Sequence, residues 1–85
     1  MEVHGIDMTQ GAYRVSFSKG DRRIRGLVPE TLLAEWLRQS GRPDHGDAYQ
    51  MIAVHRTEIQ AALTVMATGE GRVRAPYDRL TLVEE

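Results

Sequence analysis

The most regular pattern of apolar and polar positions lies in residues 47–68. Apolar residues recur there three and four positions apart, which places them on one side of an α-helix. Asp47 and Gln50 are spaced as a capping box, and Gly69 supplies the left-handed residue that commonly ends a helix. The pattern predicts one continuous helix. Its buried side would consist of Ala48, Met51, Ile52, His55, Ile59, Ala62, Leu63 and Met66.

Two strands are predicted before this helix. In residues 12–18, Tyr13, Val15 and Phe17 alternate with polar residues, which is the two-residue period of a strand with one buried face. Residues 22–28 form the second strand, and a turn at Lys19-Gly20-Asp21 connects the two. A short connection of this kind favours an antiparallel hairpin. The core face of the second strand would carry Ile24, Gly26 and Val28.

A shorter amphipathic helix is predicted between the hairpin and the long helix. Pro29 suits the first helical turn, Glu30 sits well near the positive end of the helix dipole, and Gly41 with Pro43 would end the helix. Its apolar side would carry Leu32, Leu33, Trp36 and Leu37.

The two ends of the chain are less regular. Residues 1–10 contain few large apolar side chains and are predicted to be a flexible start or a short edge segment. After Gly69, residues 73–75 are predicted as a short strand and residues 76–79 as a tight turn. Residues 80–83 then form a final strand or an ordered tail.

The expected fold is a single α+β domain over residues 1–85, with the order ββααβ. In this two-layer arrangement, both helices cover one face of an antiparallel sheet and bury its apolar side chains. The predicted core brings Tyr13, Val15, Phe17, Ile24 and Val28 against Leu33, Trp36, Leu37, Ile52, Ile59, Leu63 and Met66.

The cysteine content and the charge of the chain exclude several classes of protein. The 85 residues include no cysteine, which excludes a disulfide, a thiolate metal site and a cysteine nucleophile. Eleven basic and twelve acidic residues nearly cancel, so no whole-molecule field attracts nucleic acid or membrane. The chain shows neither a signal sequence nor an apolar run long enough to span a bilayer. We therefore expect a small cytoplasmic protein with no membrane partner.

Several of these residues resemble a known family. The arginine-rich strand ending in Val28, the helix start Glu30-Thr31-Leu32 and the spacing Ile52-x-x-His55-Arg56-x-x-Ile59 are similar to the bacterial domain-of-unknown-function family 1488, of the Shewanella-type small α+β fold. The resemblance covers about residues 13–82. It departs from the family at Pro29, where serine is common, and at Ile52, where an aromatic residue is common. It implies a fold but no reaction, cofactor or site.

His55, Arg56 and Glu58 are the candidate ligand or partner contacts. A histidine within the apolar side of a helix either packs as a hydrogen-bonded neutral imidazole or opens onto a pocket. The packed interpretation is favoured, and Glu58 lies one turn away, where it could pair with the imidazole. Arg56 is expected to lay its aliphatic stem over the core, with anion binding as the alternative.

Arginines form the second candidate site. Of the eleven basic residues, all but Lys19 are arginine. Strand alternation places Arg14, Arg23 and Arg25 on the sheet face away from the helices. A solvated face is the favoured interpretation, followed by an acidic protein partner and then a nucleic-acid backbone. The last is weakened because Tyr13 and Phe17 point to the other face and cannot stack on bases. The complete set of candidates for this basic sheet face is Arg14, Arg23, Arg25, Arg72 and Arg74.

The remaining motifs indicate no further chemistry. Asp44, His45 and Asp47 lie close in sequence, but a short loop rarely turns three ligands inward, so no metal site is expected. No nucleophile motif or phosphate loop is present, and no cofactor is expected.

The sequence favours a non-catalytic accessory or interaction module that binds an unidentified protein or self-associates through a sheet edge. Nucleic-acid binding is the alternative, and an enzyme or ligand site around His55 and Arg56 ranks last.

Overall fold

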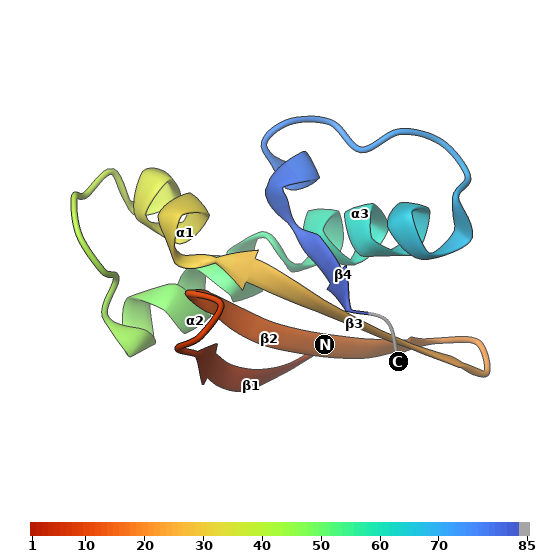
Figure 1. The fold of residues 1–85 in the computed structure, drawn as a ribbon, viewed down its shortest axis with the longest axis horizontal. Helices are drawn as coiled ribbons and strands as arrows, with labels where there is room; N and C mark the ends of the chain where they lie inside the picture. Colours follow the sequence, from red (N-terminus) through yellow and green to blue (C-terminus); the bar gives the residue numbers. More distant parts are fainter. Residues whose placement is uncertain (84–85) are drawn as a thin grey trace.

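The computed structural model describes residues 1–83, which form one antiparallel sheet with the strand order β1-β2-β3-β4 and three α-helices (Figure 1). The α+β class predicted from the sequence is therefore confirmed. In chain order the elements are β1 (Glu2–Asp7), β2 (Ala12–Lys19), β3 (Arg22–Pro29), α1 (Glu30–Leu37), α2 (His45–Val54), α3 (Arg56–Thr68), the 3-10 turn η1 (Tyr77–Arg79) and β4 (Thr81–Val83).

The β2–β3 hairpin forms as its alternating pattern predicts. Val15 pairs with Gly26, and Phe17 pairs with Ile24 in an antiparallel register. Gly20 adopts a φ of 63° in the connecting turn, a backbone conformation that glycine reaches without steric cost. The hairpin places its apolar face toward the helices and leaves its polar face away from them.

The predicted order ββααβ omits one strand. Residues 2–7, expected to be a flexible start or an edge segment, form the edge strand β1, which pairs antiparallel with β2. The register shifts between Val3 and Ile6, and Gly5 within this bulge has a φ of 94°. A bulge interrupts the two-residue period of a strand, which is why the apolar pattern of this segment looked irregular.

The long helix predicted over residues 47–68 is broken. His55 has φ and ψ of −97° and 14° and separates α2 from α3. The break lets α2 pack against α1 while α3 packs against β3 and β4 (Figure 1). The predicted capping box is also wrong, because α2 begins at His45 with Asp44 as its N-cap, which places Asp47 within the first turn. The predicted stop at Gly69 is confirmed, with a φ of 73°.

Two further boundaries differ from prediction. α1 ends earlier than expected, because Arg38 already adopts the left-handed conformation with a φ of 56°. Residues 73–75 are not a strand. Instead, β4 pairs with β3 and brings Leu82 opposite Gly26, so the closing strand comes from the segment predicted as a strand or an ordered tail.

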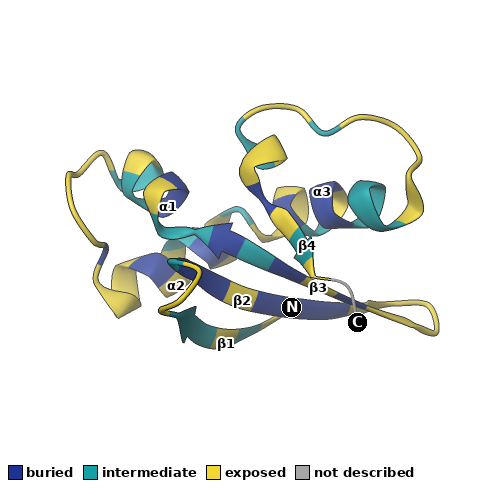
Figure 2. Cartoon of the chain, in the orientation of Figure 1, coloured by how far each residue is buried: buried dark blue, intermediate teal, exposed yellow. Residues whose placement is uncertain are grey.

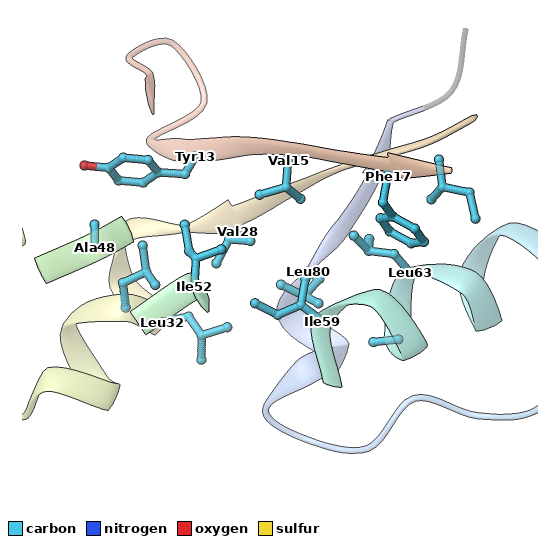
Figure 3. Close-up of a cluster of buried hydrophobic side chains, with 13 residues drawn as sticks. Tyr13, Val15, Phe17, Val28, Leu32, Ala48, Ile52, Ile59, Leu63 and Leu80 are labelled. Carbon is cyan, nitrogen blue, oxygen red and sulfur yellow. The ribbon is translucent and has the colours of Figure 1, made fainter. Parts of the chain in front are cut away.

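The core lies between the sheet and the helices. Figure 2 shows the buried positions along β2 and β3 and on the helix sides that face them. In Figure 3, side chains from β2 point toward α2 and α3. Trp36 and Met66 pack against this core but remain partly exposed. The buried cluster consists of Tyr13, Val15, Phe17, Ile24, Val28, Leu32, Leu33, Ala48, Ile52, Ile59, Ala62, Leu63 and Leu80. Within residues 1–83, no helix has the length and apolar character needed to cross a membrane.

Candidate functional site: the open face of the sheet

The sheet face away from the helices carries a depression of about 570 Å³. It lies over β1, β2, β3 and the end of β4, and arginines from two strands border it. Strand alternation explains this composition, because Tyr13 and Phe17 turn into the core and their neighbours in β2 must face the other way. The lining residues are His4, Arg14, Val15, Ser16, Arg23, Arg25, Gly26 and Val83.

Ser16 is the polar centre of this surface. It is only 1% exposed although it lies on the outward face. Its Oγ lies 2.6 Å from Nε2 of His4, and Nη2 of Arg23 donates a hydrogen bond to the same oxygen at 2.9 Å. The hydroxyl thus ties together side chains from β1 and β3 across β2, which restricts the rotamers of both partners.

The basic side chains that bond to Ser16 contact an exposed carboxylate. Glu2 lies 3.2 Å from Nη2 of Arg23 and 3.8 Å from Nε2 of His4, but more than half of its side chain is exposed. Solvent-exposed pairs of this kind contribute little stability, since water screens them. Arg14 donates only a long hydrogen bond, 3.4 Å, to the backbone carbonyl of His4. In the described part of the chain, Glu2 is the one acidic side chain in ion-pair contact with this surface.

The structure does not bring Arg72 and Arg74 to this face, contrary to the sequence prediction. Both lie in the segment between α3 and η1, because residues 73–75 do not join the sheet. They border a separate hollow of about 340 Å³ over α3, together with Glu58 and Tyr77. The basic sheet face therefore consists of Arg14, Arg23 and Arg25.

His55 lies at the junction of α2 and α3 and is partly buried. Its ring stacks on Trp36 with a centroid distance of 3.8 Å and an interplanar angle of 11°. Its Nδ1 lies 3.0 Å from the hydroxyl of Tyr77, so the imidazole has a hydrogen-bond partner in the fold. Burial, and secondarily the carboxylate of Glu58, raise the pKa of Tyr77. Arg56 is exposed and forms no ion pair within residues 1–83.

A second contact between a histidine and a tyrosine lies at the start of α2, where His45 meets Tyr13. The buried Tyr13 hydroxyl is 2.8 Å from Nδ1 of His45, and burial, followed by the Glu30 carboxylate, raises the pKa of Tyr13. Arg42 donates to Oε2 of Glu30 at 3.2 Å, while Oε1 has no partner within residues 1–83. Over these same residues, no three histidine or acidic side chains gather as a metal site would require.

His4 and Ser16 were missed as site residues. Strand alternation places Ser16 on the outward face of β2, where Arg23 is also predicted, but nothing in its sequence neighbourhood indicates that His4 would cover it. The only available signal was the short alternation around Val3 in β1, which the bulge at Gly5 ends after a few residues.

The known protein families, characterised proteins and solved structures with which the chain was compared contain no match. Function must therefore be argued from the surface itself, because a fold alone does not determine one.

Proposed function

We propose that the chain is a non-catalytic interaction module whose open sheet face binds an acidic segment of a partner protein. One observation carries this proposal: Arg14, Arg23 and Arg25 border a single depression together with His4. Guanidinium groups form strong bidentate hydrogen bonds with carboxylates, and an excess of one charge steers an oppositely charged partner to the surface. Membership in family 1488 stays a prediction and would be compatible with this role.

Nucleic acid is the second candidate, since the same arginines could contact phosphates. The composition of the face argues against it. Sheets that bind single strands stack bases on exposed aromatic rings, whereas Tyr13 and Phe17 are buried on the opposite side. Among the described residues that line the depression there is no phenylalanine, tyrosine or tryptophan. An acidic peptide needs no such ring, and this difference favours the protein partner.

The test is a titration of the protein with a fluorescent peptide rich in glutamate, in parallel with a labelled single-stranded oligonucleotide. We expect the peptide to bind with an affinity that falls as salt rises, because the contacts are solvent-exposed. Arg14→Gln and Arg25→Gln should each weaken binding about two- to five-fold, the range that an exposed charge pair contributes. The double variant Arg72→Gln/Arg74→Gln removes the same kind of charge away from the face and should bind normally.

Three results would count against this function. One is a peptide affinity that is equally sensitive to Arg72→Gln/Arg74→Gln, which would indicate non-specific attraction. Another is tighter binding of the oligonucleotide than of the peptide, which would support the nucleic-acid alternative. The third is no binding of either probe at low salt, which would remove the basic face as a binding surface.

A further inference from the structure

Ser16 is almost fully covered by its neighbours, and the hydrogen bonds of its hydroxyl have defined directions. Arg23 can only donate, so Oγ of Ser16 accepts that bond at 2.9 Å. The single hydroxyl proton must then find an acceptor elsewhere. Within residues 1–83, the one acceptor in hydrogen-bond contact with this hydroxyl is Nε2 of His4, at 2.6 Å. A neutral His4 with an unprotonated Nε2 therefore satisfies the hydroxyl of Ser16.

Protonation of His4 reverses this hydrogen bond. Both nitrogens of an imidazolium are donors, so Nε2 must then donate to Oγ, which already accepts from Arg23. The hydroxyl proton loses its acceptor. The O–H bond of Ser16 can then point toward the depression that Ser16 itself lines. Without a ligand, water in the depression is the remaining acceptor for this proton, whereas a carboxylate placed there would accept it in a stronger, charge-assisted hydrogen bond.

The surroundings of His4 add a direct charge effect. On its own strand, Glu2 lies 3.8 Å from Nε2. From β2 and β3, Arg14, Arg23 and Arg25 line the same depression, and β4 contributes the uncharged Val83. Within residues 1–83, a positive charge on His4 is thus added to a depression lined by guanidinium groups, with Glu2 as the carboxylate that contacts His4. An anionic ligand would offset the repulsion among these cations, so ligand and proton favour each other.

From these contacts we infer that the basic sheet face is a proton-linked anion site, in which binding of the acidic segment is coupled to proton uptake by His4. The inference rests on the proposed function and adds its regulation. Because linkage is reciprocal, affinity rises as the pH falls through the range in which imidazole side chains titrate, roughly pH 5 to 8. Uptake of one proton limits the effect to at most about tenfold per pH unit.

The experiment measures the dissociation constant of the glutamate-rich peptide from about pH 8 to about pH 6, where glutamate stays ionised. A phosphorylated probe is unsuitable, since its second ionisation lies near pH 6. The wild-type protein should bind more tightly at the lower pH, and calorimetry in buffers of different ionisation enthalpy should detect proton uptake. His4→Gln should bind with little pH dependence, while His45→Gln and His55→Gln should retain it.

Two more variants separate the contributions. Glu2→Gln removes the carboxylate that contacts His4 and should retain the pH dependence. Ser16→Ala removes the hydroxyl donor but keeps the charge change, so its pH dependence should be smaller than that of the wild type. A pH dependence that survives in His4→Gln, or a wild-type affinity that does not change with pH, overturns the inference but leaves the proposed function intact. Absence of peptide binding at every pH overturns both.

Discussion

Gly26 in β3 lies directly against the side chain of Leu63 in α3. A Cβ atom at position 26 would lie 2.6 Å from Cδ2 and 2.7 Å from Cδ1 of Leu63, and 3.1 Å from the carbonyl oxygen of Thr81. The absence of a side chain at this position therefore allows α3 to approach the sheet while β4 pairs with β3. Because Leu63 is fully buried, its methyl groups have little room to move away.

Gly26→Ala should therefore destabilise the fold by about 1–3 kcal/mol, the usual cost of forcing an extra carbon into a packed core. Urea unfolding followed by circular dichroism would measure the change. Gly46→Ala is the matched control, because the nearest atom to its Cβ would be 3.8 Å away and alanine is favoured over glycine within a helix. If both substitutions left stability unchanged, close packing at Gly26 would not be the reason for glycine there.

The contact between Gly26 and Leu63 illustrates what the sequence could predict. The alternation of Tyr13, Val15 and Phe17 is local, and it correctly indicated which face of β2 the helices cover. The same two-residue period predicts that Gly26 lies on the core face of β3, where it contacts Leu63. In both cases the two-residue repeat of a strand determines which face of the sheet a side chain occupies, independently of the rest of the fold.

Tertiary contacts determined the features that the sequence did not reveal. The apolar residues of α2 and α3 keep the same helical spacing on both sides of His55. The sequence pattern therefore predicts one continuous helix and gives no sign of the break. What holds the break is a ring stack on Trp36 and a bond to Tyr77, 22 residues away. Likewise, the contact of His4 with Ser16 depends on the bulged register of β1, and the bulge interrupts the two-residue pattern that otherwise specifies a register.

The bond between His55 and Tyr77 should be measurable as a coupling energy. His55→Leu keeps an apolar body against Trp36 but leaves the Tyr77 hydroxyl without this partner, and we expect a loss of about 0.5–1.5 kcal/mol. Tyr77→Phe should cost a similar amount, and the double variant should cost less than the sum of the two. Strictly additive losses in urea unfolding would show that the two side chains do not stabilise each other.

The end of α1 offers a stabilising substitution. Arg38 adopts a φ of 56°, and it is the one residue other than glycine with a positive φ in the described part of the chain. Arg38→Gly should raise the free energy of unfolding by about 0.5–1 kcal/mol, because glycine reaches this conformation without a Cβ clash. Arg38→Ala removes the same guanidinium but keeps the Cβ, so it should give no comparable gain. A stabilisation shared equally by both variants would assign the effect to charge instead.

The buried tyrosines predict how stability depends on pH in the alkaline range. Burial raises the pKa of Tyr13, and of Tyr77, above the ordinary value, so the folded state keeps protons that the unfolded chain releases from about pH 10. With more protons bound in the folded state, the contribution of these tyrosines to the free energy of unfolding should be constant below that pH and decrease as the pH rises above it. Tyr13→Phe should lower stability at neutral pH, since the bond to His45 is lost, but flatten the alkaline decrease. Tyr77→Phe should flatten it further in the double variant, as measured by urea unfolding over a pH series. An alkaline decrease as steep in the double variant as in the wild type would mean that other groups cause it.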